Sequence, residues 1–161
     1  MLHYLMKDGD EDVPFPKDAM YIQDCNALFH TLTNLPPTFS GICLHILDLM
    51  ASKCNFVFST DSYHPDSIKT QERLRRGCGE QFLLSGPATR KPKDFKIFLS
   101  NNENKKQFCE VIKEVWGSSS AASRLEKSNT TVLIVNGKAY MIKSENGQVR
   151  KLDNLISLFK K

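Results

Sequence analysis

The fold of this chain is decided by residues 56–76, Phe56-Val57-Phe58-Ser59-Thr60-Asp61-Ser62-Tyr63-His64-Pro65-Asp66-Ser67-Ile68-Lys69-Thr70-Gln71-Glu72-Arg73-Leu74-Arg75-Arg76. Its first three residues are strong strand formers with no polar residue between them, which predicts a strand covered on both faces. Pro65 breaks this run, and Asp66 or Ser67 can cap the helix that follows. Asp61 is therefore expected at the carboxyl end of a strand, where open α/β sheets place their chemistry.

The helix after this strand carries three positive charges on one face. Lys69, Arg73 and Arg76 fall at i, i+4 and i+7, so their side chains point the same way. Residues 69–96 hold eight Lys or Arg against three Asp or Glu, whereas the net charge of the whole chain is only +4. A basic segment in a nearly neutral chain indicates a local anionic partner. Each part alone is more commonly a buried strand, a surface aspartate or a solvated helix, and it is their order that favours a site.

Length and composition are those of a single folded domain. The chain has 161 residues, of which 40% are hydrophobic and 25% charged, enough to bury a sizeable core. We expect residues 1–17 to form an irregular leader and residues 18–161 to form one domain. The leader is too acidic for a signal peptide, and no apolar run in the sequence is long enough to span a bilayer.

Cysteine usage predicts a reduced, intracellular protein. The five cysteines are odd in number and widely spaced, and no Cys-x-x-Cys occurs. No histidine lies at zinc-ligand spacing from any of them. We expect Cys43 and Cys54 to be core residues.

Nucleophilic catalysis has little support in the sequence, because no Gly-x-Ser-x-Gly occurs and no Cys-His pair can be placed together. His30 and His45 lie in apolar helical patterns and are expected to pack rather than to bind a ligand. His64 lies in the turn after the deciding strand, where it is either a surface residue or a neighbour of a bound anion.

A strand-helix-strand unit leads into the deciding stretch. Residues 20–22 predict a short strand that ends at Asp24, and residues 24–32 predict a first helix. Thr38 can cap a second helix over residues 39–50, whose apolar positions follow the helical period. Because strand, helix and strand at this spacing form a βαβ crossover, the two strands should pair in parallel.

This crossover brings two aspartates to one edge of the sheet. Asp24 and Asp61 each follow a strand of the parallel pair, and neighbouring strands lie about 4.8 Å apart. Two carboxylates that converge on one edge suit a divalent metal held by oxygen ligands. The alternative is that both are unrelated capping or surface residues, since Asp is common at helix starts.

The sequence between residues 95 and 123 predicts two helices followed by a loop. Residues 95–99 favour a short helix, and residues 108–116 form the apolar face of another. Trp116 is expected in the core rather than as a platform on which a nucleic-acid base stacks. Residues 118–123 are small and Ser-rich, which is typical of a loop.

The clearest local signal is a hairpin near the carboxyl end. Two β-rich runs, residues 130–135 and 138–142, flank Asn136-Gly137, the preferred type I′ turn. Asn146-Gly147 predicts a second turn. Residues 152–159 are short and amphipathic.

Three of these segments resemble a known superfamily. Residues 21–28, Tyr-Ile-Gln-Asp-Cys-Asn-Ala-Leu, are similar to the opening of PIN-like and flap-endonuclease-like nucleases. Residues 56–76 resemble the second signature of that superfamily, in which a strand ends in Asp and a Pro-containing turn leads to Lys and a basic helix. Asp-x-Tyr-x-x-x-Ser-Ile-Lys over residues 61–69 also resembles a group of animal, often transposon-associated PIN-like proteins, and residues 104–116 and the hairpin have counterparts there.

The resemblance implies a fold, a chemistry and a set of site residues. The fold would be α/β, a mostly parallel sheet flanked by helices in three layers, with a β-hairpin near the carboxyl end. One or two Mg²⁺ or Mn²⁺ ions would activate water for phosphodiester hydrolysis. Asp24 and Asp61 would be metal ligands, and Lys69, Arg73 and Arg76 would contact backbone phosphates of a nucleic acid without reading its sequence.

The chain departs from the family pattern at three places. Cys25 stands where glycine is usual, and Ser59-Thr60 separate the strand from Asp61, an offset that could point this carboxylate away from Asp24. The family's second acidic cluster, which should follow the hairpin, has no counterpart. The chain is therefore expected to be an amino-terminal portion of such a domain or a degenerate relative.

Two hypotheses of different classes follow. The first is a metal-dependent, nuclease-like domain that acts on nucleic-acid phosphodiesters, whether active or inactive as given. The second is a non-catalytic domain of the same fold that binds nucleic acid or protein. The sequence does not choose between DNA and RNA and does not predict an oligomeric state.

Overall fold

The computed structural model describes residues 18–61, 68–77 and 79–153, and within them the side chains of Thr70, Arg73, Leu74, Arg76 and Asp153 are left out. A single five-stranded sheet organises the described residues. Its strands follow the order β1-β2-β3-β4-β5, with β1 at Tyr21–Asp24, β2 at Asn55–Ser59, β3 at Thr130–Val135, β4 at Lys138–Glu145 and β5 at Gln148–Asp153. Strands β1, β2 and β3 run parallel, and β4 and β5 are antiparallel additions. The α/β class and the hairpin are confirmed, and the sheet is mixed, with its parallel part confined to β1, β2 and β3.

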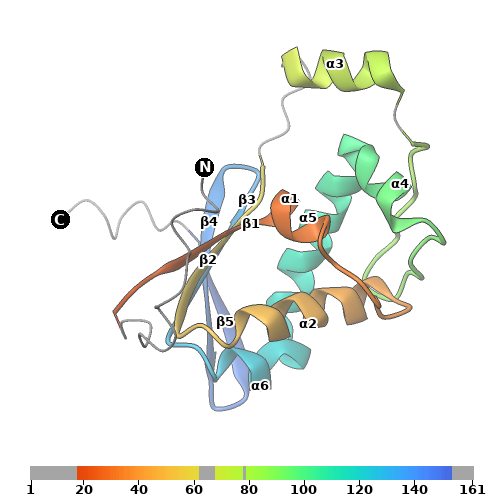
Figure 1. The fold of residues 1–161 in the computed structure, drawn as a ribbon. Coiled ribbons are helices and arrows are strands. Elements are labelled where there is room, and N and C mark those ends of the chain that lie inside the picture. The colour runs from red at the N-terminus through yellow and green to blue at the C-terminus, as the bar shows by residue number, and fades with distance from the viewer. Residues whose placement is uncertain (1–17, 62–67, 78, 154–161) are drawn as a thin grey trace, which may run out of the picture.

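The helices of the described residues lie on one side of this sheet (Figure 1). They are α1 (Cys25–Phe29), α2 (Phe39–Met50), α3 (Ile68–Arg76), α4 (Phe95–Ser100), α5 (Asn102–Trp116) and α6 (Ala122–Leu125), with a short 3-10 helix η2 (Ser119–Ala121) before α6. Helices α2 and α5 pack on each other and form the main covering layer. Helix α3 stands apart from this layer at the top of the molecule in Figure 1.

The predicted crossover is confirmed. Strand β1 pairs in parallel with β2 and places Asp24 opposite Ser59. Thr38 caps α2, because its hydroxyl accepts a hydrogen bond from the backbone N–H of Gly41 at 3.2 Å, which satisfies a donor that the helix itself leaves unpaired. The first helix is shorter than expected and ends at Phe29.

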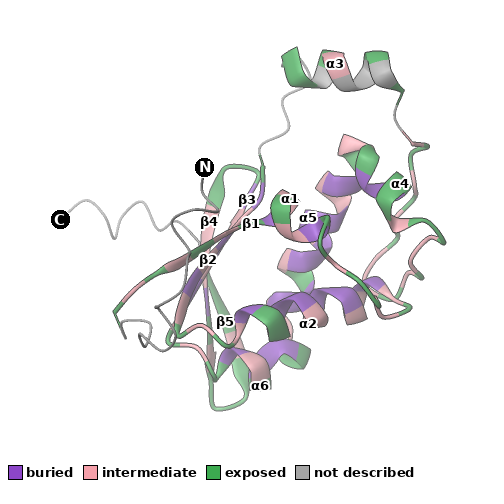
Figure 2. Ribbon diagram, viewed as in Figure 1, coloured by how far each residue is buried: buried purple, intermediate pink, exposed green. Residues whose placement is uncertain are grey.

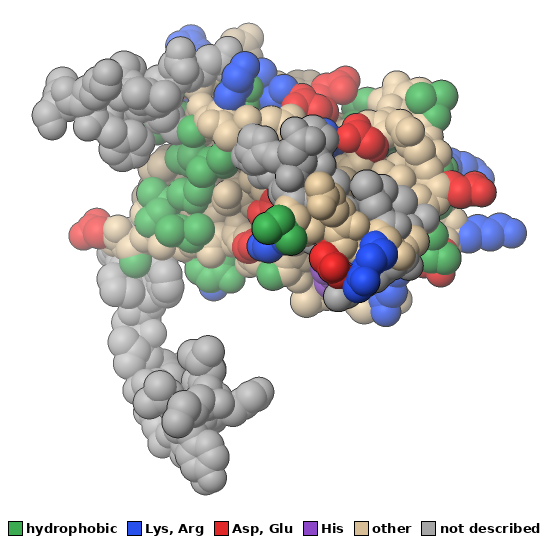
Figure 3. Space-filling view, turned by 90° about the horizontal axis from the view of Figure 1, so that it is seen from above, with side chains coloured by type: hydrophobic (Ala, Val, Ile, Leu, Met, Phe, Trp, Pro, Cys, Tyr) green, Lys and Arg blue, Asp and Glu red, His purple; other side chains and the backbone are tan. Residues whose placement is uncertain are grey.

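The expectation that β2 is covered on both faces is wrong for the described residues. Phe56 and Phe58 are buried under the helices, whereas Val57 on the opposite face is only half-buried and Ile22 beside it on β1 is 71% exposed. Burial therefore alternates along β2, because the described helices cover only one face of the sheet. Figure 3 shows apolar side chains gathered along the flank away from those helices.

The core is built from aromatic rings between α2, α5 and the sheet, where buried residues concentrate in Figure 2. Trp116 is fully buried, as expected. Its ring centroid lies 6.1 Å from that of Phe56 and 5.2 Å from that of Phe58, and its indole N–H donates to the Cys43 carbonyl at 3.0 Å. This single side chain thus ties α5 to β2 and to α2.

The two predicted Asn-Gly turns are confirmed, whereas the predicted Ser-rich loop is not. Asn136 and Gly137 have φ of 50° and 75°, and Asn146 and Gly147 have φ of 51° and 74°, so both Asn-Gly turns have the left-handed backbone of type I′ turns. The Ser-rich loop over residues 118–123 is wrong, because η2 and α6 occupy it and bury Ala121 and Leu125.

Three further expectations need correction. Cys54 is exposed, whereas Cys43 is buried as predicted, because Cys54 lies in the turn between α2 and β2 rather than on the face of either. His30 is exposed at the end of α1 and does not pack. Leu152 belongs to β5, and the rest of the amphipathic stretch, residues 154–159, lies outside the described residues, as does His64.

An extended segment before α4 is held by amides from α5. Asn104 accepts from the backbone N–H of Phe82 at 2.7 Å and donates to the Glu80 carbonyl at 3.0 Å. One turn on, Gln107 accepts from Leu84 N–H at 3.1 Å and donates to the Phe82 carbonyl at 3.1 Å. These side chains replace the neighbouring strand that an extended backbone needs, since its buried polar groups must be paired. At the start of the segment only glycine fits at position 79, where a Cβ would meet the Ile97 carbonyl oxygen at 2.6 Å.

Burial of Cys43 predicts a loss of stability in alkaline solution. Desolvation raises the pKa of this thiol above its ordinary value, so the unfolded chain releases the proton first. The free energy of unfolding should then fall as pH rises above about 8.5, by up to about 1.4 kcal/mol per pH unit for one proton. Urea unfolding at pH 8 and at pH 10 measures this fall in the free energy of unfolding.

The control for this effect is Cys43→Ala, which cannot ionise. The stability difference between the unaltered chain and this variant should shrink between pH 8 and pH 10. A difference that stays constant over that range would show that the Cys43 thiol ionises equally in both states.

Candidate carboxylate site

The carboxyl ends of the parallel strands form a rim that carries both predicted aspartates. Asp24 is the last residue of β1 and lies opposite Ser59, the last residue of β2. Asp61 follows two residues later. The backbone N–H of the intervening Thr60 donates to the Ile134 carbonyl of β3 at 2.9 Å. The chain therefore stays bonded to the sheet until just before Asp61, which fixes that residue at the rim.

Asn26 joins the two aspartates. The carboxylate of Asp24 caps α1, accepting from the backbone N–H of Asn26 at 2.7 Å and of Ala27 at 3.2 Å. The side-chain amide of the same Asn26 donates to Oδ2 of Asp61. Both carboxylates are thus bonded to one residue, one through its backbone N–H and the other through its side-chain amide. The Ser59-Thr60 offset does not point Asp61 away from Asp24.

Cys25, between Asp24 and Asn26, has a packing role. Cys25 is fully buried, and the pKa of its thiol is raised above the ordinary value, first by a hydrogen bond with Cys109 of α5 and then by burial. The backbone N–H of Asp61 also bonds to this sulfur and acts in the opposite direction. Cys25 therefore anchors the backbone of Asp61 to the core beneath the rim.

The donor set at the rim suits a hard cation. Both aspartates are exposed. The hydrogen bonds described above use only Oδ1 of Asp24 and Oδ2 of Asp61, which leaves the other oxygen of each carboxylate available to a cation. The hydroxyl of Thr60, although buried, has no hydrogen-bond partner among the described residues. Mg²⁺ is commonly held by one or two carboxylates, with waters and substrate phosphates completing its octahedron. These residues fit such an ion, which would polarise a bound phosphoryl oxygen and lower the pKa of a bound water.

The acidic set is small. Within residues 18–61, 68–77 and 79–153, no group of three His, Cys, Asp or Glu side chains is close enough to hold a metal ion. Any further ligands would come from substrate, from water or from residues beyond these ranges.

The basic residues of the prediction lie on α3, which follows the rim in the chain. Lys69 is exposed there, and Arg75, which the prediction did not include, is exposed and pairs with Glu72 at 3.6 Å. Lys69, Arg73 and Arg76 are all in the helix as expected, but the side chains of the two arginines are outside the description. Figure 3, which views the molecule from above, shows acidic and basic side chains close together on that face.

Sequence reasoning missed Asn26 as a site residue. A signal was present, because an Asn two residues after an N-cap Asp lies in the first turn of the helix, where its side chain can reach a neighbouring strand end. The buried Thr60 hydroxyl had no such signal, since its burial depends on how α1 and α5 close over the sheet.

Comparisons with known proteins add no family to this geometry. No family model, no curated protein and no solved structure matches the chain. Among the described helices none has the length and apolar character needed to cross a bilayer.

Proposed function

We propose that this chain is a metal-dependent, nuclease-like domain that acts on phosphodiesters of nucleic acids. The observation that carries the proposal is the pair Asp24 and Asp61, joined through Asn26 at the carboxyl ends of the parallel strands β1 and β2. In the proposed arrangement these carboxylates hold Mg²⁺ or Mn²⁺, and the phosphate that undergoes attack supplies further oxygen ligands.

The position of α3 supports nucleic acid as the substrate. Helix α3, which begins seven residues after Asp61 in the sequence, carries Lys69, Arg73, Arg75 and Arg76. Their contacts would be to phosphates, independent of sequence and weakened by salt. The full PIN-like, three-layer arrangement and the retention of catalysis belong to this proposal.

Metal titration tests the site. Asp24→Asn keeps the cap on α1, because Asn caps helices as well as Asp does, and Asp61→Asn keeps the shape of the side chain. Each change should weaken Mn²⁺ binding about tenfold or more, measured by calorimetry, because a carboxylate ligand loses its charge. Asp18→Asn, an exposed aspartate ahead of β1, is the matched control and should bind Mn²⁺ unchanged.

Unchanged Mn²⁺ affinity in the Asp24→Asn, Asp61→Asn double variant would remove the site assignment. Cleavage of labelled DNA and RNA strands with Mn²⁺ present then separates an active domain from an inactive one, with the double variant as the blank.

The second candidate is a non-catalytic nucleic-acid-binding domain, favoured by the exposure of Lys69 on a helix that stands apart from the core. This candidate requires that binding to nucleic acid persists in EDTA and in the Asp24→Asn, Asp61→Asn double variant. In that case Lys69→Ala should reduce the slope of log affinity against log salt by about one, with no cleavage under any metal condition.

A further inference from the structure

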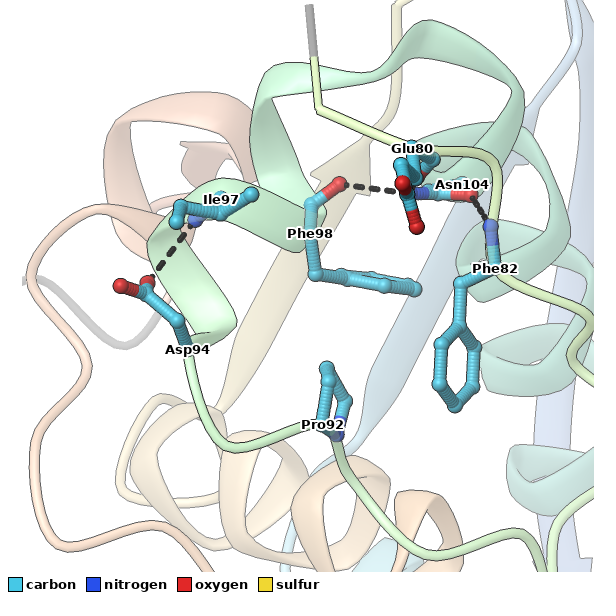
Figure 4. A pocket seen from close by; sticks show the side chains of 7 residues that line it. All are labelled: Glu80, Phe82, Pro92, Asp94, Ile97, Phe98 and Asn104. Carbon is cyan, nitrogen blue, oxygen red and sulfur yellow. Dashed lines mark hydrogen bonds between the residues drawn. The ribbon is translucent and has the colours of Figure 1, made fainter.

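A pocket of 270 Å³ lies between the amide-held segment and α4, away from the aspartates of the rim. Its walls are apolar and come from Phe82, Pro92, Ile97 and Phe98, while Glu80 and Asp94 contribute carboxylates. Figure 4 shows the Glu80 side chain reaching in above the rings of Phe98 and Phe82, with Pro92 on the opposite side.

The pocket is formed by contacts that fix its shape. Asn104 holds the Glu80 and Phe82 backbone and also donates to the Phe98 carbonyl at 3.0 Å, so both of its N–H donors are already used. Asp94 caps α4, with Oδ1 accepting from Ile97 N–H at 3.0 Å. The polar group left for a ligand over the rings is the Glu80 carboxylate, whereas the second oxygen of Asp94, at the far end of the pocket in Figure 4, is directed away from them.

We propose that this pocket binds the side chain of an arginine presented by a partner protein. Two carboxylates and, among the described residues, no basic side chain line it, so its charge is complementary to a cation. An apolar stem is needed to fill the space beside Pro92 and Ile97. A guanidinium group on such a stem stacks flat on an aromatic ring while it donates two hydrogen bonds to one carboxylate.

Other occupants fit the pocket less well. An apolar side chain would desolvate the Glu80 carboxylate without replacing its hydrogen bonds. A lysine ammonium carries the positive charge but is not planar, so it cannot stack flat on the Phe82 ring as a guanidinium can. Lys93 and Lys96 flank Asp94 in the sequence but do not line the pocket, so they weaken the attraction for a cation without filling the space.

The test uses short blocked peptides with a single varied residue. Acetyl-Gly-Arg-Gly-amide, added to the ¹⁵N-labelled chain, should shift the amide resonances of Phe82, Ile97 and Asn104. The citrulline peptide has the same shape without the charge and should bind about tenfold more weakly, as should the lysine and norleucine peptides.

Two variants tie binding to the carboxylates. Glu80→Gln and Asp94→Asn should each weaken binding of the arginine peptide several-fold, since each removes a negative charge from the pocket. Asn at position 94 keeps the helix cap. Glu126→Gln, an exposed glutamate at the end of α6, is the matched control and should leave binding unchanged. The Asp24→Asn, Asp61→Asn variant should also bind normally, because the pocket is independent of the proposed function.

The proposal would be overturned by equal binding of the arginine and citrulline peptides, by tighter binding of the norleucine peptide, or by shifts that map away from Phe82 and Ile97. Equal binding of lysine and arginine would also overturn it, since the match to a planar guanidinium would then be wrong.

Discussion

Trp116→Ala should be the most destabilising single substitution considered, lowering the free energy of unfolding by about 3–5 kcal/mol. The indole is fully buried and packs against Phe56 and Phe58. Its removal leaves a cavity where α5, α2 and β2 meet, which the surrounding rings cannot fill without leaving their own contacts. Urea unfolding followed by circular dichroism measures the loss.

Two further variants show how much of the loss in Trp116→Ala comes from packing. Trp116→Phe keeps an aromatic ring and loses the bond to the Cys43 carbonyl, so it should cost about 1–2 kcal/mol. Leu83→Ala removes a side chain that is 81% exposed and should change stability by less than about 0.5 kcal/mol. If Trp116→Ala cost no more than Leu83→Ala, the packing of α5 against the sheet would be wrong.

Asn104→Asp should have the second-largest effect, a loss of about 2–4 kcal/mol, although it changes only an amide to a carboxylate of the same shape. The fully buried Asn104 donates to two carbonyls, of Glu80 and Phe98. A carboxylate cannot donate, so both oxygens lose their partner and face a buried negative charge. Amide hydrogen exchange at Phe82 and Leu84 should accelerate, because the segment loses its anchor.

Asn129→Asp is the control for this change, because Asn129 is exposed before β3 and should tolerate a carboxylate. Equal stability of the two variants would mean that the amides of α5 do not hold the segment over residues 79–84.

The elements that could be predicted from the sequence are those that local chemistry decides. Thr38 caps α2 wherever that helix packs, and Asn136-Gly137 turns the chain because asparagine and glycine tolerate positive φ. The parallel pairing of β1 and β2 followed from the length of the connection between them. Strand β5 was not predicted, because Gln-Val-Arg-Lys-Leu-Asp over residues 148–153 carries little β signal until β4 is beside it.

The candidate site was only half predictable for a similar reason. Parallel topology brought Asp24 and Asp61 to one rim, but whether they met depended on two residues of offset that sequence cannot orient. Asn26 and the Thr60 backbone settled it, the first by bonding to Asp61 and the second by staying on the sheet. Burial of Thr60 depends on how distant parts of the chain pack around the end of β2, information that is non-local.

The apolar row on the outer face of the sheet has a consequence for how the strands find their alignment. Ile22, Val57, Val132, Met141 and Leu152 lie opposite one another across all five strands. Strand β3 in particular has apolar residues on both faces, with Leu133 and Val135 buried and Val132 and Ile134 on the outer face. A one-residue slip of β3 would exchange one apolar set for another and expose few polar groups to the core, so hydrophobic alternation does little to forbid it. The two-residue turns at Asn136-Gly137 and Asn146-Gly147 must then fix the register of the carboxyl-terminal strands, and lengthening either turn should yield a mixture of slipped pairings.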